Sequence, residues 1–363
     1  MANVLDLKRR IRSVKNTRQI TKAMKMVSAA KLRRAQERAM QARPYAQMLA
    51  AVLESLVRRT AMYDDAAGEV MHPLLVEREE KNVLVLVIAG DKGFAGAFNS
   101  NIGKAAQNFV NERVAKGQDV DVETVGRKSR DLFKRRYQDA TWEHKDVEYD
   151  NGLSHHIEDI RHRAQQVELT YDRSNLLAKL NFSEVDKAAH SIIERYERAE
   201  IDAVYLVFNE FKSVIAQRVV VEKLLPIRKL GTHEYTAIEE MTEEQREAAA
   251  HAASTSGVSI HEPEQTAMEE EAKKFGTADV DYLFDQDPKR LFRHLMPRYV
   301  TTQIYHALIE SVASEHASRM TAMDAASSNA SDMIDTLTLT MNRVRQAAIT
   351  KEIIEIVSGA SAL

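Results

Sequence analysis

The sequence predicts an α/β protein with long helices: an antiparallel coiled coil of the N- and C-terminal segments, with a central open-sheet α/β domain between them. Three observations lead to this prediction. Apolar or small residues recur at alternating spacings of three and four through both ends of the chain, as in a heptad repeat. The middle alternates apolar runs with amphipathic segments. Of the 363 residues, 44% are apolar, only 6% are aromatic and 14 are Met, which favours helix packing.

The first helix is expected over 1–60, followed by a connector over 61–81. Polar residues occupy its heptad positions between 18 and 28, and apolar residues there shift to a neighbouring stripe of Ile20, Met24 and Val27. We interpret this shift as a helix that faces more than one partner. Pro44 should kink the helix. The heptad seam comprises Leu7, Ile11, Val14, Arg18, Thr21, Lys25, Ser28, Leu32, Ala35, Ala39, Ala42, Ala46, Leu49, Leu53 and Leu56.

The last helix is expected over 298–363, with a kink or a helix start at Pro297. Sixty residues of helix would be ~90 Å long, which exceeds what a globular domain of this mass can bury. The two long helices are therefore expected to pair with each other, and we call this coiled coil the shaft. The second seam comprises Ala313, His316, Met320, Met323, Ser327, Ala330, Ile334, Leu337, Met341, Val344 and Ala348.

The central domain is expected over 82–231. The apolar run 82–90 is typical of a strand buried on both faces, and 119–126 is a second strand. A helix is predicted over 182–200, and 201–211 and 214–226 are predicted to pair as strands. Strand and helix alternate as in an open, Rossmann-like sheet with helices on its faces. The segment 277–297 would lead back to the shaft.

The segment 232–276 is an acidic insertion, with eleven Glu against Arg246, Lys273 and Lys274. It is expected to be a flexible loop or partial helix that forms no part of a core. Residues 1–59 have the opposite character, with fifteen Lys or Arg against three acids and a net charge of +12. Such a basic face fits plain solvation, nucleic acid or an acidic protein surface, although the lack of aromatic residues before Tyr45 weakens the nucleic-acid interpretation.

Several kinds of chemistry are disfavoured. The chain has no Cys, which excludes disulfides and thiolate sites, and its longest apolar run, 83–90, is too short to span a membrane. The N-terminus has no uninterrupted apolar stretch typical of a secretory signal. The stretch GDKGFAG (90–96) matches neither nucleotide-binding spacing, so its glycines are interpreted as turn residues. We expect no catalytic residue and no cofactor.

One cluster of His and Asp residues has the side-chain types of a metal site. On a helix, Asp159 would share a face with His155 and His162, and His156 lies beside them. Metal sites usually take ligands from more than one element, so a solvated surface is the preferred interpretation.

The N-terminal stretch KRRIRSVKNTRQITKAMKMV and the C-terminal pattern I-T-x-E-x-x-E-x-x-x-G-A-x-A stand near the two ends of the chain. With these motifs the ends closely resemble those of the gamma subunit of F-type, proton-translocating ATP synthase, and the resemblance extends over nearly all of the chain except 232–276. The C-terminal pattern is matched at Ile349, Thr350, Glu352, Glu355, Gly359, Ala360 and Ala362.

The resemblance implies a central rotor stalk that turns inside three alpha and three beta subunits. Its middle domain would contact the epsilon subunit and the membrane-embedded c ring, so that proton flow turns the shaft and drives the catalytic sites through their conformations. It also implies a subunit without catalysis of its own, a peripheral protein on the cytoplasmic face of a bacterial inner membrane, held there through the c ring only. No nucleic acid is implied. Insertions modulate rotation in some relatives, and we expect 232–276 to lie on the outer surface of the middle domain with such a role.

Residue roles follow from the same resemblance. Contacts with beta are implied for Met24, Lys25, Arg319, Arg345, Gln346, Thr350 and Glu352. Contacts with the c ring or epsilon are implied for Tyr282, Phe284 and Asp285, the last two of which replace a more common Tyr and Glu. The helix tip, expected to turn in an apolar collar with weak, non-directional contacts, comprises Ile353, Ile356, Val357, Gly359 and Ala360. The alternative from another class is a basic coiled-coil adaptor or nucleic-acid-binding protein whose ends match by accident.

Overall fold

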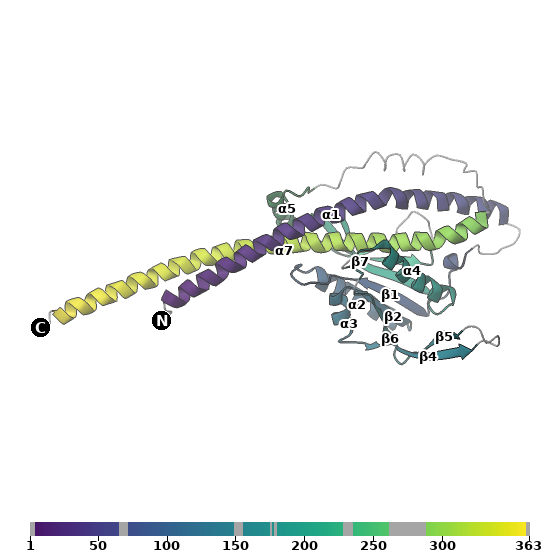
Figure 1. Cartoon of the computed structure of the whole chain (residues 1–363), viewed down its shortest axis with the longest axis horizontal. Coiled ribbons are helices and arrows are strands. Elements are labelled where there is room, and N and C mark those ends of the chain that lie inside the picture. Colours follow the sequence, from purple (N-terminus) through teal and green to yellow (C-terminus); the bar gives the residue numbers. More distant parts are fainter. Residues whose placement is uncertain are drawn as a thin grey trace.

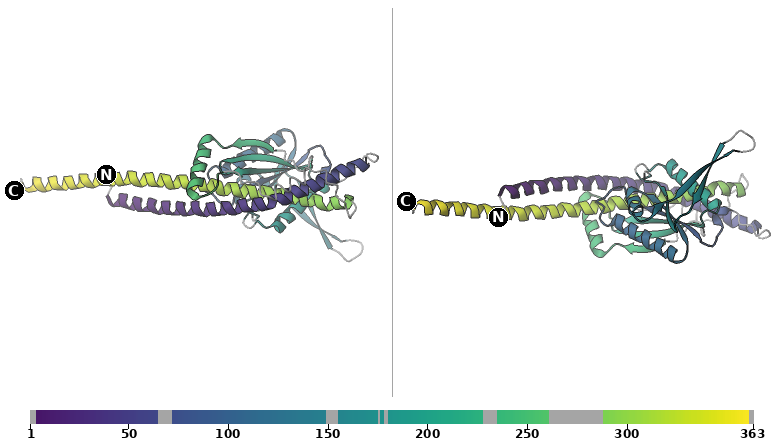
Figure 2. Two further views of the ribbon diagram at one scale, coloured as in Figure 1. Left: turned by 90° about the horizontal axis from the view of Figure 1, so that it is seen from above. Right: turned by 90° about the horizontal axis from the view of Figure 1, so that it is seen from below.

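The computed structural model describes residues 4–64, 72–148, 155–174, 176–177, 180–227, 235–260 and 288–360. Two long helices, α1 (Val4–Asp64) and α7 (Pro288–Ala360), run side by side in opposite directions, with a sheet domain against one side of the pair (Figure 1). Seen from above and from below, α7 continues well past the start of α1 as a single helix (Figure 2). The predicted antiparallel pair is confirmed.

Pro44 and Pro297 both lie in the interior of the long helices. α7 begins at Pro288, ahead of Pro297, so the expectation of a helix start at Pro297 is wrong. Pro44 lies within α1, which changes direction part-way along its length (Figure 1).

One seven-stranded sheet forms the central domain, in the order β3-β6-β2-β1-β7-β8-β9. The first five strands in this order are parallel, whereas β8 and β9 add on as antiparallel strands. The open α/β sheet and the antiparallel pairing of β7 with β8 are therefore confirmed. The strands are β1 (Asn82–Ile88), β2 (Asp119–Val125), β3 (Gln138–Asp139), β6 (Val167–Asp172), β7 (Ala203–Ser213), β8 (Ala216–Leu225) and β9 (Tyr235–Glu240).

Alternate residues of β1 serve two different cores because successive side chains of a strand point to opposite faces. Leu84, Leu86 and Ile88 pack with α4 and the two long helices, whereas Val83 and Val85 pack with α2. Burial on both faces explains the uninterrupted apolar run. The remaining helices are the 3-10 helix η1 (Pro73–Leu75), α2 (Phe98–Ala115), α3 (Arg127–Phe133), α4 (Phe182–Glu197) and α5 (Glu243–Ser256).

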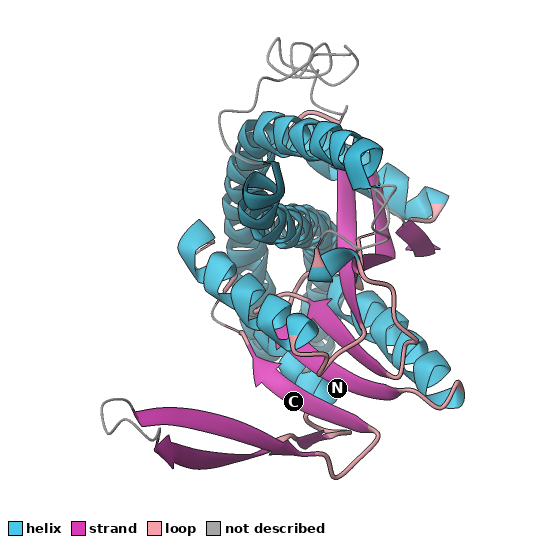
Figure 3. Cartoon of the chain, turned by 90° about the vertical axis from the view of Figure 1, so that its right-hand side faces the viewer, coloured by secondary structure: helices cyan, strands magenta, loops and turns pink. Residues whose placement is uncertain are grey.

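The strands β4 (Thr141–Glu148) and β5 (His155–His162) form a separate antiparallel hairpin that projects from the domain (Figure 3). The helix considered for 155–162 is therefore wrong. Arg161 anchors the base of the hairpin through ion pairs with Asp121 and Glu168, which are almost fully buried. Burial alone would raise the pKa of Asp121, but hydrogen bonds and charges from Arg161 and neighbouring arginines outweigh it and lower that pKa.

The acidic insertion is part of the fold where the structure describes it. β9 extends the sheet, and α5 buries Ala249, Ala252 and Ala253 in a cluster with residues of α1 and α7. The expectation that 232–276 forms no part of a core is therefore wrong. Alanines at helical spacing, hidden among the glutamates, form the buried face. Residues 261–287 lie outside the described residues, and with them Tyr282, Phe284 and Asp285.

Candidate functional site

Three of the four polar heptad positions of α1 between residues 18 and 28 are buried, and the fourth, Arg18, is exposed. Thr21, Lys25 and Ser28 are each less than 10% exposed, whereas Ile20 and Val27 of the neighbouring apolar stripe are 61% and 56% exposed. The seam therefore keeps its heptad positions, and the idea that it changes stripe is wrong. The second surface inferred from that stripe is nevertheless present, as exposed apolar side chains on the opposite side of α1.

Hydrogen bonds replace apolar packing along this polar section of the shaft. Thr21 Oγ1 lies 2.7 Å from Ser327 Oγ, and Lys25 Nζ donates to Asp324 Oδ1 at 2.6 Å. As the residue number increases along α1, the residue number of the hydrogen-bond partner on α7 decreases, as expected for two antiparallel helices. Polar groups at a seam fix one register, because sliding the helices would leave them buried without partners.

Helix α5 closes this polar section from the outside. Lys25 Nζ also donates to Thr255 Oγ1 at 2.7 Å, and His251 Nδ1 lies 2.9 Å from Asp324 Oδ2. Arg33 donates from its guanidinium to the Gly257 carbonyl at 2.6 Å. A capping box of Thr242 and Gln245 starts α5, and Gly257 ends it in the left-handed conformation with φ 65°. The insertion thus connects both shaft helices to the sheet through β9.

The charge of Asp324 is held by its neighbours. Burial alone would raise the pKa of this carboxyl group, but hydrogen bonds from Lys25 and His251, and their charges, outweigh burial and lower the pKa below its usual range. The carboxylate is therefore ionised at neutral pH and pairs with the Lys25 ammonium, whose side chain is only 9% exposed.

The glycine-rich stretch 90–96 binds the shaft itself. Arg319 of α7 donates to the Lys92 and Gly93 carbonyls at 3.3 and 3.2 Å, and pairs with Glu315 at 2.5 Å. A Cβ atom on Gly90 would lie 2.7 Å from Cδ of Glu315, so a larger residue here would displace the Glu315 side chain. Helix α7 passes beside the carboxyl end of β1, the edge where open α/β sheets commonly bind ligands.

Further contacts join α7 to the strands. Ser311 Oγ donates to the Ile88 carbonyl of β1 at 3.3 Å, and Ser314 Oγ donates to the Asn209 carbonyl of β7 at 3.4 Å. His316 lies between the loop and α1; burial, and then the charges of Arg319 and Lys31, lower the pKa of His316 to about 4. The shaft and the sheet consequently share one packed core.

Of the residues expected to contact beta, two are buried within the chain and the others are at least partly exposed. Lys25 and Arg319 are each 7% exposed and bind partners within the chain, so their charged ends do not face an outside surface. Met24 lines a groove of about 500 Å³ between α1 and the loop after β1, beside the 72% exposed Phe94. Several basic side chains border this groove: Lys31, Lys92, Arg127 and Lys128.

The other predicted residues lie on the free end of α7. Arg345, Gln346, Thr350 and Glu352 are exposed there, and the Thr350 hydroxyl donates only to the Gln346 carbonyl of its own helix at 2.9 Å. At the tip, Ile353, Ile356 and Val357 are 55%, 70% and 62% exposed. Gly359 and Ala360 complete the helix.

Sequence reasoning missed Asp324, His251 and Thr255. A usable signal existed for the first, because Lys25 at a seam position needs a buried acceptor on the facing helix. Nothing in the sequence alone placed α5 beside that pair. Among the described residues, no group of three or more His, Asp or Glu is arranged to hold a metal ion. A search of the same residues finds no helix long and apolar enough to span a bilayer.

Comparison with known proteins finds relatives that match this chain over its full length. The family model described as ATP synthase matches residues 3–363. The ATP synthase gamma chain of Solibacter usitatus is 43% identical over 362 residues, which cover 100% of this chain and 99% of the relative. The gamma chain of Pelotomaculum thermopropionicum is 40% identical, with 100% of both chains covered. The chain belongs to the ATP synthase gamma-chain family.

The extent of the match decides between the two functional alternatives. The match spans the insertion as well as both ends, so accidental likeness of the end motifs, and with it the adaptor or nucleic-acid alternative, is not favoured. These gamma chains come from bacteria, as does that of Geobacter metallireducens, which is 39% identical over 100% of this chain and 99% of the relative. A solved chain from the Tetrahymena thermophila mitochondrial ATP synthase central stalk and c ring aligns with a TM-score of 0.48 and 19% identity over 85% of this chain and 99% of that one.

Proposed function

We propose that the chain is the central rotor stalk of an F-type ATP synthase, which couples proton flow through a c ring to conformational cycling of alpha and beta catalytic sites. The carrying observation is the free end of α7. Its tip exposes Ile353, Ile354, Ile356 and Val357 beyond the start of α1, on a shaft that is packed firmly onto the sheet. A rigid axle with a bare apolar end suits turning inside an apolar collar, because apolar contacts are non-directional.

The proposed partners are three alpha and three beta subunits around the free end, with epsilon and the c ring at the sheet domain. The chain does no bond chemistry in this role and needs no cofactor. It is a peripheral protein on the cytoplasmic face of a bacterial inner membrane, held through the c ring, with Tyr282, Phe284 and Asp285 in the contact with the ring and epsilon. The coupling ion is a proton in this proposal.

Contacts with beta are proposed at exposed positions. Met24 and its basic groove suit an acidic loop, because the long stems of Lys and Arg tolerate several geometries as the rotor turns. Arg345, Gln346, Thr350 and Glu352 provide a second contact on the free end of α7. Lys25 and Arg319 act indirectly in this proposal: the first fixes the register of the shaft, and the second fixes the shaft to the loop after β1.

Co-purification tests the function. The tagged full-length chain is expressed with the alpha, beta and epsilon subunits of its own organism, and the purified material is assayed for subunits and for ATP hydrolysis. We expect a complex with three alpha and three beta per chain that hydrolyses ATP. A chain that instead purifies with nucleic acid, released with a steep dependence on salt, would overturn the proposal.

The insertion is proposed to modulate rotation through α5. Because the chain has no Cys, a His251→Cys, Asp324→Cys double variant allows α5 to be locked to the shaft by a disulfide. If α5 undocks during the cycle, oxidation should slow ATP hydrolysis, and reduction should restore the rate. A matched double variant at the exposed positions Glu247 and Asp332 controls for the chemistry. Equal rates for the oxidised and reduced enzyme would show that α5 is a fixed brace and would refute modulation by undocking.

A further inference from the structure

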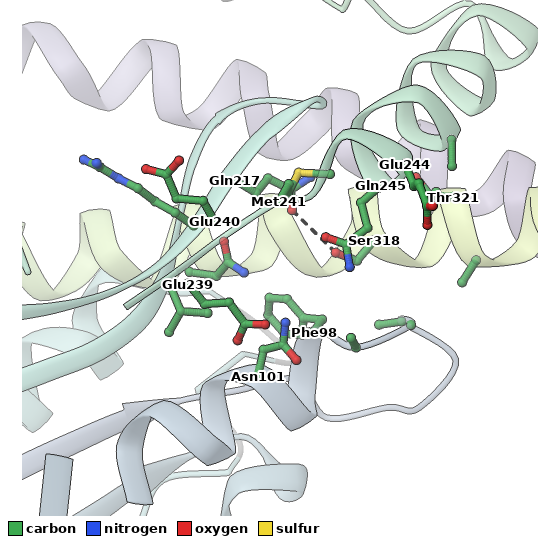
Figure 4. Close-up of a pocket in the computed structure, with 18 of the residues that line it drawn as sticks. Phe98, Asn101, Gln217, Glu239, Glu240, Met241, Glu244, Gln245, Ser318 and Thr321 are labelled. Atoms are coloured by element: carbon green, nitrogen blue, oxygen red, sulfur yellow. Dashed lines mark hydrogen bonds between the residues drawn. The ribbon is translucent and has the colours of Figure 1, made fainter. Parts of the chain in front are cut away.

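A cavity of about 320 Å³ lies between the insertion, the shaft and the sheet (Figure 4). Its walls come from the start of α2, from β8, from β9 with the turn into α5, and from α7. Many wall residues are small, so that no side chain fills the space; they comprise Ala95, Gly96, Ala97, Ala248, Ala322 and Ala325. The volume is at the lower end of the range typical of small-molecule sites.

The apolar part of the cavity has a defined surface. Phe98 closes one end and Met241 lies at the turn into α5, so that a compact ring would contact both side chains (Figure 4). Burying a compact apolar ring against these two side chains is favourable because apolar area is removed from water.

Acidic side chains outnumber basic ones around the cavity, beside amide and hydroxyl groups that can both donate and accept hydrogen bonds. Glu239 and Glu244 line it and make no ion pair among the described residues, whereas Glu240 pairs with Arg246 at 3.7 Å. Arg218 also lines the cavity, but its charge is offset by a close ion pair with Glu210. The net charge on the walls is therefore negative.

One buried side chain adds a further acceptor. Gln217 is 8% exposed and donates its amide nitrogen to the Val214 carbonyl at 2.9 Å. This leaves its Oε1 facing Ser318 Oγ at 3.5 Å, the limit of a hydrogen bond (Figure 4). The oxygen thus retains capacity to accept a stronger hydrogen bond from a ligand.

We propose that this cavity binds a small amphiphilic amine, a compact apolar ring that carries one protonated amino group. The ring packs between Phe98 and the alanines of α5 and α7, and the ammonium donates to the Glu239 carboxylate and to Gln217 or Ser318. The positive charge of the ligand matches the carboxylates of Glu239 and Glu244, which lie at the exposed edge of the cavity, and the ammonium can donate to each acceptor named. Because the walls include both α5 and α7, a bound amine also stabilises the docking of the insertion on the shaft.

Three probes that share an indole ring test the charge requirement: tryptamine, which is cationic, tryptophol, which is neutral, and indole-3-acetate, which is anionic. Binding to the purified full-length chain is measured by isothermal titration calorimetry at neutral pH. We expect tryptamine to bind at least ~10-fold more tightly than tryptophol, equivalent to ~1.4 kcal/mol, and the anion to bind most weakly. Equal affinity for the three probes, or no measurable binding of tryptamine, would overturn the proposal.

Variants locate the site. Glu239→Gln should weaken tryptamine and leave tryptophol unchanged, whereas Ala325→Leu should fill the cavity and weaken both. Glu243→Gln is the matched control. It also removes one carboxylate charge, at the start of α5, but from a residue that does not line the cavity. Tryptamine binding that survives Ala325→Leu, or that falls equally in Glu243→Gln and Glu239→Gln, would show that the amine binds elsewhere. These measurements use the chain alone, so their failure would leave the rotor proposal intact.

Discussion

The two halves of α7 have opposite surroundings. Up to Ile334 the helix buries most of its apolar side chains against α1, α4 and the sheet, whereas Leu339, Ile349 and Ile353 are 65%, 48% and 55% exposed. We call residues 288–334 the braced half and residues 335–360 the bare half. The braced half is stabilised within the chain, whereas the exposed apolar residues of the bare half would become buried in the assembly that we propose.

The largest expected effect on stability comes from truncating a buried side chain of α1 that packs against the braced half of α7. Leu32 of α1 is fully buried in the cluster that joins α1, α5 and α7, so Leu32→Ala should lower the free energy of unfolding of the full-length chain by ~2–5 kcal/mol. Denaturant unfolding followed by circular dichroism measures this loss. The control is Leu339→Ala in the bare half, which should change stability by less than ~0.5 kcal/mol. Equal losses would contradict the comparison.

A smaller effect is expected at the polar section of the shaft. Asp324→Ala leaves the nearly buried Lys25 ammonium with only Thr255 as acceptor and should cost roughly 1–3 kcal/mol of unfolding free energy. A double-mutant cycle with Lys25→Ala isolates the pair, and the two losses should be less than additive. Asp332→Ala, at an exposed position of the same helix, should be close to neutral. Additive losses in the cycle would show that the pair is not coupled.

The same region shows how much could be predicted from the sequence. The heptad period located both helices, and the apolar runs located the strands of the sheet, because burial on one or both faces leaves a periodic pattern. The polar seam at Thr21 and Lys25 was misinterpreted, since its partners lie some 300 residues away on α7. The buried alanines of α5 were hidden by the surrounding glutamates, which dominate composition but face water.

The site residues divide in the same way. The tip residues could be singled out from their apolar pattern alone, and the structure shows Ile353, Ile356 and Val357 exposed; their contact with a collar stays a prediction. The burial of Arg319 could not be inferred, since it depends on the carbonyl groups of the loop after β1. Long-range contacts of this kind leave no local pattern in the sequence.

Stability should also depend on pH through the braced half. The pKa of His316 is lowered to about 4, mainly by burial and then by the charges of Arg319 and Lys31, against 6.5 in the unfolded chain. Between these values the unfolded chain binds more protons, so stability is lost as the pH falls from 6.5 towards 4, by at most ~1.4 kcal/mol per pH unit for one group. Unfolding midpoints measured across this range should show the slope.

The variant His316→Gln separates this contribution from a second one. His72, whose pKa is also lowered to about 4 chiefly by burial, keeps its own slope in the variant, so the dependence should become shallower without vanishing. The bare half contains no histidine and should contribute nothing in this range. An unchanged slope in the variant would mean that His316 does not titrate as its burial requires.

The smallest effect on the chain itself is expected at the tip. Ile356 is 70% exposed, so Ile356→Ser should change the unfolding free energy of the isolated chain by less than ~0.5 kcal/mol. In the assembled complex the same change should be measurable, because burying an isoleucine side chain is worth ~1.5–3 kcal/mol, and a fraction of that is lost. Release of the chain from the complex at rising urea concentration measures this loss, with Lys351→Ser at an exposed position five residues earlier as the control. A variant that is neutral in both settings would show that the tip remains in water, and the bare half would then have no collar to turn in.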